Sequence, residues 1–142
     1  MDETGDQAIR KGGCLCGAVR YELRGPLRPV VACHCRQCQI SHGNFAAYTR
    51  LPLTGFALTV EEGLKWYASS EKARRGFCGS CGASLFWEPI GSGEISVAAG
   101  SIDPPSGLST CRHIFVASKG DYYELTDGLE QLAAGQGPAK QP

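Results

Sequence analysis

The sequence has no long apolar run and no excess of charge of either sign. Lys and Arg together number 14 in 142 residues, and Asp and Glu also number 14, so the formal net charge is zero. This balance argues against broad electrostatic binding of nucleic acid or of an anionic membrane. No stretch approaches the roughly 18 apolar residues of a membrane-spanning helix. We therefore expect neither a nucleic-acid partner nor a membrane partner.

The start of the sequence has no pattern of a secretory leader. Met1 is followed by the acidic and polar stretch DETGDQ, where a leader needs a basic start and an apolar segment. The expected location is the cytoplasm, where thiols are kept reduced. Eight cysteines in such a compartment indicate metal binding rather than disulfides.

Long amphipathic helices are also missing, and short strands dominate the pattern. We expect a mainly β, single domain over residues 12–132, between flexible tails at 1–11 and 133–142. A helical turn is expected at 36–42 and a short helix from residue 126. The expected strands, separated by Gly, Pro and Ser, are 18–23, 45–51, 56–60, 64–69, 83–89, 94–100 and 112–118.

Two of the cysteine motifs together supply four thiols. Cys14 and Cys16 form a C-x-C pair, and Cys78 and Cys81 form a C-x-x-C pair within CGSCG. Four thiolates satisfy the tetrahedral shell of zinc, so we predict a structural zinc site that joins two distant segments. The alternative for Cys78 and Cys81 is a redox pair, which leaves the C-x-C pair unexplained.

The third motif, CHCRQC, supplies three thiols from Cys33, Cys35 and Cys38. Three protein ligands are typical of a catalytic zinc that keeps a position for substrate. The alternative is a second structural site whose fourth ligand is Cys111, His34 or His42. In extended chain His34 points away from its two cysteine neighbours, whereas His42 can return on a helical turn.

An open site of three thiolates favours sulfur chemistry. The soft ligand field suits a fourth sulfur, and a thiol that coordinates zinc loses its proton. The resulting thiolate is a nucleophile toward a carbonyl carbon. We therefore predict that Cys33, Cys35 and Cys38 form the catalytic site for making or breaking a carbon–sulfur bond.

The combined motifs resemble the glutathione-dependent formaldehyde-activating family, which includes centromere protein V. The matching stretches cover about residues 12–132 and are GGCLCGAVRYEL, CHCRQCQISHG, FCGSCGASLFW, AAGSIDPP, HIFVASKGDYY and TDGLEQL. The resemblance implies a tent-like, mostly antiparallel fold of the Mss4-like type with two zinc ions. By motif position, the structural ion has four cysteine ligands (Cys14, Cys16, Cys78 and Cys81), and the catalytic ion has Cys33, Cys35 and Cys38.

The activity implied by the resemblance is that of a carbon–sulfur lyase, which condenses glutathione with formaldehyde. The expected partners are a small thiol and an aldehyde, and a homo-oligomer is compatible with the sequence. Glutathione carries carboxylates, so cations are expected at its site. Arg36 lies within the catalytic motif and is the predicted binding residue, while further cations occur at Arg50, Lys72, Arg74 and Arg75.

The chain departs from the family at two places. Tyr122 or Tyr123 stands where the family often has Trp, and Glu130 stands where a Pro commonly follows DGL. Two other functions are compatible with the motifs. One is a zinc-stabilised, non-catalytic binding module of the centromere protein V type, and the other is a redox or zinc-buffering protein.

Overall fold

The computed structural model describes residues 8–135, which form short strands and one short α-helix. The helix is α2 (Arg36–His42). Three 3₁₀ turns follow strands at Leu53–Gly55, Ala99–Ser101 and Val116–Ser118. The strands are β1 (Ile9–Gly13), β2 (Arg20–Arg24), β3 (Val30–Cys33), β4 (Ala46–Pro52), β5 (Phe56–Val60), β6 (Leu64–Ala68), β7 (Ala73–Cys78), β8 (Ser84–Pro89), β9 (Glu94–Ala98), β10 (Thr110–Ile114) and β11 (Glu130–Gln131).

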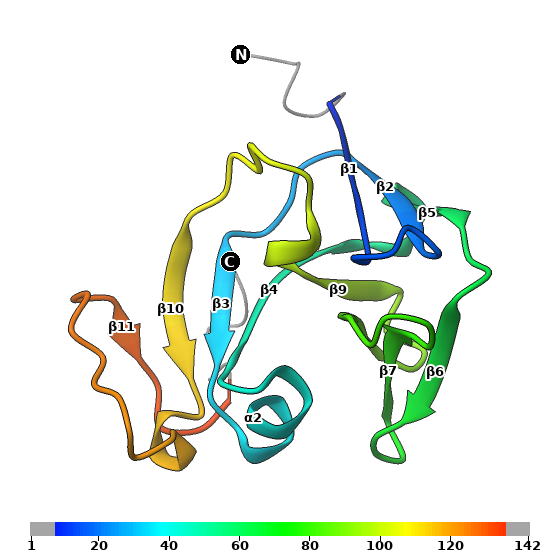
Figure 1. Ribbon diagram of the computed structural model, residues 1–142. Helices are drawn as coiled ribbons and strands as arrows, with labels where there is room; N and C mark the ends of the chain where they lie inside the picture. The colour runs from blue at the N-terminus through cyan, green and yellow to red at the C-terminus, as the bar shows by residue number, and fades with distance from the viewer. Residues whose placement is uncertain (1–7, 136–142) are drawn as a thin grey trace.

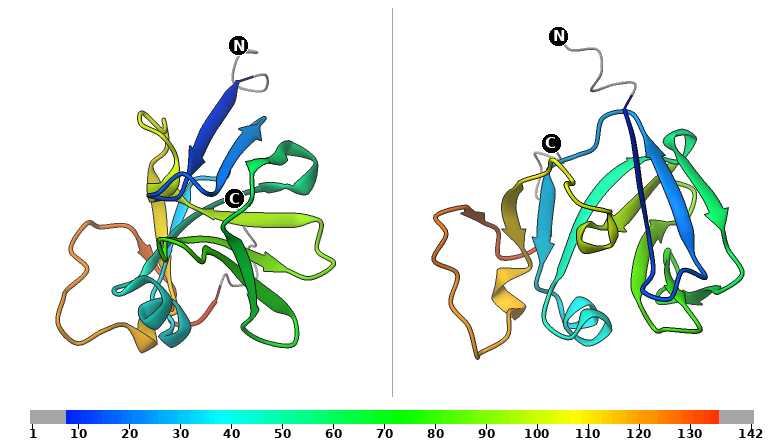
Figure 2. Two further views of the ribbon diagram at one scale, coloured as in Figure 1. Left: turned by 45° about the vertical axis from the view of Figure 1, so that its right-hand side comes forward. Right: turned by 45° about the horizontal axis from the view of Figure 1, so that its top comes forward.

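The strands form two sheets. The small sheet has the antiparallel order β1-β2-β5, and the large sheet has the order β11-β10-β3-β4-β9-β8-β7-β6. All pairs in the large sheet are antiparallel except β3 with β10 and β10 with β11. Figure 1 shows α2 where the chain passes from β3 to β4, and Figure 2 shows the small sheet from two further sides. The predicted mainly β class is confirmed, with two parallel pairs in an otherwise antiparallel arrangement.

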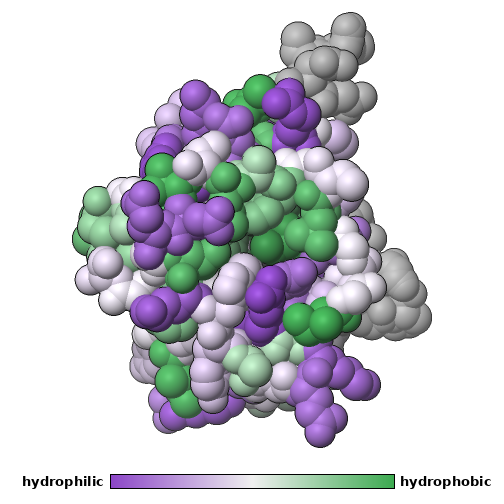
Figure 3. All heavy atoms as spheres, turned by 90° about the vertical axis from the view of Figure 1, so that its right-hand side faces the viewer, coloured by the Kyte–Doolittle hydropathy of each residue, from purple (hydrophilic) through white to green (hydrophobic). Residues whose placement is uncertain are grey.

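The main core contains side chains from both sheets. Tyr21 and Leu23 of β2 lie in one cluster with Leu51 of β4, Phe86 of β8 and Val97 of β9. The alternation of buried and half-exposed residues along β2 explains why one face of the small sheet enters this cluster. The side of Figure 1 that carries β5 and β6 faces the viewer in Figure 3, where apolar side chains gather between hydrophilic ones.

The prediction of strands is right in most places and incomplete in four. β1, β3, β7 and β11 were not expected. Three of the four residues of β3 are buried, so the strand lacks the polar alternation that marks a half-exposed strand. β7 contains two consecutive arginines, Arg74 and Arg75, which hide its pattern. The strand expected at 112–118 ends at Ile114, because Phe115 adopts a left-handed conformation with φ of 57°.

The prediction of flexible tails is wrong for residues 9–11 and 133–135. Ile9 and Lys11 pair with Arg24 and Glu22 of β2. At the other end, the carbonyl oxygens of Ala133 and Ala134 accept hydrogen bonds from the backbone N–H groups of Ala117 and Phe115. The remaining predicted tail residues in 1–7 and 136–142 lie outside the described residues.

The short helix expected from residue 126 is also wrong. Asp127 accepts a hydrogen bond from the backbone N–H of Leu129 at 3.0 Å, and Gly128 has φ of 78°. This local turn favours an extended exit over a helix. The chain then forms β11, which pairs with β10. Within residues 8–135, the helices are too short and polar to cross a bilayer.

Phe86 lies at the centre of the aromatic part of the core. Its ring centroid is 5.5 Å from that of Tyr21, 5.1 Å from that of Phe56 and 6.0 Å from that of Trp66. Only 1% of the residue is exposed. The packing of β8 against β2, β5 and β6 therefore depends on this ring.

We expect Phe86→Ala to lower the free energy of unfolding by roughly 3–5 kcal/mol, because it removes a buried ring and leaves a cavity. Urea denaturation of the zinc-loaded protein measures the loss. Tyr67→Ala is the control, since Tyr67 is 63% exposed, and it should cost less than about 1 kcal/mol. Equal losses in the two variants would contradict the assignment of Phe86 to the core.

Candidate functional site

The first cysteine cluster joins the loop between β1 and β2 to the turn between β7 and β8. The Sγ atoms of Cys14, Cys16, Cys78 and Cys81 all lie within 4.8 Å of one another. Cys16 Sγ is 3.8 Å from both Cys14 Sγ and Cys78 Sγ. A zinc–sulfur distance of about 2.3 Å in a tetrahedron requires sulfur–sulfur distances of about 3.8 Å. The four thiols therefore fit a zinc ion.

Backbone N–H groups hold these sulfur atoms in place. Cys14 Sγ accepts from Val19 N at 3.2 Å, and Cys78 Sγ accepts from Ser80 N at 3.3 Å and Cys81 N at 3.4 Å. Gly82, with φ of 83°, closes the second turn by donating from its N–H to the carbonyl of Cys78. N–H groups directed at sulfur favour the thiolate form that a metal requires.

Gly63 leaves space for this cluster. A Cβ atom at position 63 would lie 2.9 Å from Cys78 Sγ and 2.7 Å from the Cβ of Ala18. The backbone at Gly63 also donates to the carbonyl of Ala18 and accepts from Gly79 N. The segment before β6 therefore contacts both halves of the cluster closely, and only a residue without a side chain fits there.

The second cluster lies where β3 leads into α2. Cys33 is the last residue of β3, Cys35 caps the N-terminus of α2, and Cys38 lies in its first turn. Their Sγ atoms are within 4.8 Å of one another. Cys35 Sγ accepts from Cys38 N at 3.4 Å, as an N-cap side chain does. The three thiols, which are half-buried or buried, form a donor set that fits zinc.

None of the three predicted candidates for a fourth ligand joins this cluster. Among residues 8–135, no His, Cys, Asp or Glu adds a ligand atom to the group of three sulfurs. His34 Nδ1 instead contacts the hydroxyl of Tyr123 at 2.6 Å, and His42 Nε2 contacts the hydroxyl of Tyr48 at 3.0 Å. Cys111 lies half-buried on β10, outside the group of three sulfurs. A second structural site closed by Cys111, His34 or His42 is therefore not supported.

His34 belongs to a series of polar contacts on the far side of the motif, which runs from two buried imidazoles to the exposed Asp127. Its Nε2 is 2.9 Å from His113 Nδ1, and His113 Nε2 is 2.8 Å from Asp127 Oδ2. Burial, followed by the positive charge of His113, lowers the pKa of His34 to about 4. Sequence reasoning missed this series, because His113 and Asp127 are distant from the cysteine motif and share no spacing with it. These polar contacts hold the segment after β10 against the cysteine motif.

A cavity of about 390 Å³ opens beside the second cluster. All three of its cysteines line the cavity, and Tyr48 and Trp87 form part of the wall. Val31 and Ile114 add apolar surface. The arginines that line it are Arg28, Arg50 and Arg75. A mostly apolar cavity with a few convergent polar groups is typical of a small-molecule site.

Arg75 connects the cavity to the thiols. Its Nη2 lies 3.7 Å from Cys38 Sγ and donates to Gln37 Oε1 at 3.2 Å, and its Nη1 donates to the Tyr48 hydroxyl at 3.3 Å. Burial raises the pKa of the Tyr48 hydroxyl, so this hydroxyl stays protonated at neutral pH. Burial, followed by the charge of Arg75, lowers the pKa of His42 to about 4. The imidazole beside this wall is therefore neutral.

The predicted cations divide into two groups. Arg50 and Arg75 line the cavity, whereas Arg36, Lys72 and Arg74 do not. Arg36 is exposed on α2 and donates to Gln39 Oε1 at 3.1 Å. Arg74 stacks on Trp66 at 3.7 Å and pairs with Glu88 at 2.9 Å. Sequence reasoning missed Arg28, because its lone charge in the otherwise uncharged stretch PLRPVVAC does not reveal that the residue lines a cavity.

We expect Gly63→Ala to weaken the first cluster, because the added methyl group displaces Cys78 Sγ or Ala18. The free energy of unfolding of the zinc-loaded protein should fall by roughly 1–3 kcal/mol, and zinc should pass faster to a chromophoric chelator. Gly100→Ala is the matched control, since nothing lies within 4 Å of a Cβ at position 100. Unchanged zinc release in the Gly63 variant would contradict the close fit.

Comparison with known proteins identifies the family to which the chain belongs and a solved structure of similar fold. Residues 9–118 match the family described as glutathione-dependent formaldehyde-activating enzyme. An uncharacterized lyase of Schizosaccharomyces pombe is 32% identical over 80 residues, and the match covers 54% of this chain and 56% of that protein. A Rhodobacter sphaeroides protein of known crystal structure has a TM-score of 0.56 at 22% identity, over 70% of this chain and 97% of that one. Since the family match covers most of the chain, the protein belongs to the glutathione-dependent formaldehyde-activating enzyme family.

Proposed function

We propose that the protein is a zinc-dependent carbon–sulfur lyase that joins a small thiol, such as glutathione, to an aldehyde. The observation that carries the proposal is the second cluster, in which three thiols line a cavity and no other residue among 8–135 adds a ligand. The family match and the lyase relative support the same reaction class. Eight free cysteines suit a reducing compartment such as the cytoplasm.

Cys33, Cys35 and Cys38 would hold the ion, and zinc bound there would acidify a thiol that enters its remaining position. In the reaction, the sulfur forms a bond to the carbonyl carbon, and the proton of the thiol passes to the carbonyl oxygen. Arg75 stabilises negative charge on the sulfur cluster through its contact with Cys38. Tyr48 and Trp87 exclude water from one wall of the cavity and position the reactants.

Cys14, Cys16, Cys78 and Cys81 would hold a second, structural zinc, which gives two ions per chain. Metal analysis of the purified protein should therefore find two zinc ions, and Cys78→Ser and Cys38→Ser should each lose one. Cys111→Ser is the control and should keep both, because Cys111 belongs to neither cluster. Loss of an ion in the Cys111 variant would show that a cysteine outside the clusters binds metal.

The same variants separate stability from activity. Cys78→Ser should lower the melting temperature strongly, because it opens the connection between the sheets, whereas Cys38→Ser should abolish turnover with a smaller effect on melting. Thermal denaturation and an assay of thiol–aldehyde adduct formation measure the two quantities. The reverse pattern would exchange the proposed structural and catalytic roles.

A direct test of the open position uses cobalt in place of zinc. Adding glutathione should change the thiolate-to-metal absorption bands of the wild-type protein. The Cys78→Ser protein, which keeps the second cluster, should show the same change, and the Cys38→Ser protein should not. If no small thiol alters the spectrum of the wild-type protein, the proposed reaction is wrong and a non-catalytic zinc module is favoured.

A further inference from the structure

Arg28 is a buried cation without an acidic partner in the described part of the chain. The residue lies two positions before the start of β3 and is 9% exposed. Nε donates to the carbonyl of Pro29 at 3.2 Å and Nη2 to the carbonyl of Tyr48 at 2.9 Å, while Nη1 has no hydrogen-bond partner. A buried charge is costly unless it is paired, so a missing anion is indicated.

The other cations around Arg28 each have a partner. Arg50 Nη1 lies 3.6 Å from Glu94 Oε1, and Arg112 Nε lies 3.2 Å from Glu130 Oε1. Arg75 faces Cys38 Sγ. A cluster of three thiolates on zinc carries a net charge of −1, which balances Arg75. In this count, the positive charge of Arg28 is the one that remains uncompensated.

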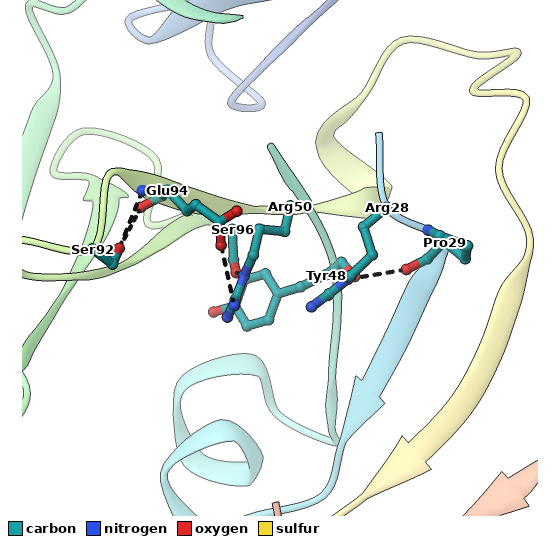
Figure 4. A network of polar contacts seen from close by, with 7 residues as sticks. All are labelled: Arg28, Pro29, Tyr48, Arg50, Ser92, Glu94 and Ser96. Carbon is teal, nitrogen blue, oxygen red and sulfur yellow. Dashed lines mark hydrogen bonds and ion pairs between the residues drawn. The ribbon is translucent and has the colours of Figure 1, made fainter. Parts of the chain in front are cut away.

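The geometry directs this charge into the cavity of the second cluster. Figure 4 shows the side chains of both Arg28 and Arg50 extending beside the ring of Tyr48. Arg50 Nε is fixed by Ser96 Oγ at 3.2 Å, and both arginines line the cavity. Burial, followed by repulsion from Arg50, lowers the pKa of Arg28 to about 10, so the side chain is still charged at neutral pH.

We propose that Arg28 and Arg50 bind a carboxylate of the substrate, so that the preferred thiol or aldehyde is a compact monoanion. The inference rests on the proposed function, since it assigns a substrate class to the same cavity. A planar guanidinium with a free N–H matches a carboxylate oxygen well. The single uncompensated charge favours a monoanion over a phosphate dianion.

The size of the cavity favours a small ligand. Its volume of about 390 Å³ is near the lower end of the roughly 300–1,000 Å³ of ligand pockets. The carboxylate and the reacting group must both fit between the arginines and the three thiols. The carboxylate and the reacting group of the ligand must therefore lie close together, as they do in a 2-oxo acid or a mercapto acid.

Matched pairs of ligands test the inference by calorimetric titration of the zinc-loaded protein. Mercaptoacetate and 2-mercaptoethanol differ in the carboxylate of the thiol, and glyoxylate and glycolaldehyde differ in the carboxylate of the aldehyde. In at least one pair the acid should bind roughly 10- to 100-fold more tightly than the alcohol. The pair that discriminates identifies which reactant carries the carboxylate.

Variants assign the preference to the arginines. Arg28→Gln should remove the advantage of the acid and leave the binding of the alcohol unchanged, and Arg28→Lys should retain part of the advantage. Arg50→Gln provides an independent variant if Arg28→Gln fails to fold, as judged by circular dichroism. Arg24→Gln, on the exposed part of β2, is the control and should bind like the wild type.

The outcomes separate this inference from the proposed function. If thiols bind but neither pair discriminates, the carboxylate site is wrong and the lyase proposal stands. If glyoxylate binds in an Arg28-dependent way and no thiol binds, the carboxylate site stands and the lyase proposal fails. An equal loss of acid and alcohol in Arg28→Gln would show a structural role for Arg28 and would overturn the inference.

Discussion

The arrangement of the whole molecule depends on how the small sheet is joined to the large one. The loop that carries Cys14 and Cys16 connects β1 and β2 of the small sheet, and Cys78 and Cys81 lie at the β7–β8 turn of the large sheet. Closing the intervening loop costs about 4 kcal/mol, whereas a structural zinc supplies roughly 10–16 kcal/mol of apparent binding free energy. Because Cys78 ends the strand that carries Arg75, this junction also helps to place a guanidinium beside Cys38. A cluster that is separate from the proposed catalytic site thus contributes to its geometry.

The cavity beside the second cluster is assembled from strands that are not consecutive in the sequence. Arg28 precedes β3, Arg50 lies on β4 and Arg75 lies on β7, and the large sheet brings them to one side of the cysteine motif. The cysteine motif itself is local, since β3 ends at Cys33 and α2 begins three residues later. The proposed reactive group is therefore specified by a short motif, while its electrostatic surroundings are specified by sheet topology. Changes in substrate preference within such a fold can arise from single strand residues without any change in the metal ligands.

Features that depend on residues close together in the sequence were predicted, whereas features that depend on residues far apart in the sequence were not. The cysteine clusters were found because C-x-C and C-x-x-C spacings are local, and α2 was found with its boundaries at 36–42. Both parallel pairs of β10 were missed, since pairing across long loops leaves no local pattern. Arg28 was missed because only its unpaired Nη1 in the folded chain distinguishes it from a surface arginine. Arg36 was chosen for its nearness in sequence, and on α2 it faces solvent beside Gln39.

The alternation of side chains around Cys33, His34 and Cys35 sets a limit on how this protein can change. Sulfur faces the cavity on one side of the chain, and the imidazole is enclosed on the other with His113 and Tyr123. The pairing of Cys33 with Ala46 and with Ile114 holds that order. Loss or gain of a single residue in β3 would exchange the two sides. The imidazole of His34 would then face the cavity, and the cysteine sulfurs would face the interior. Evolution of this segment is thus confined to replacement at constant length.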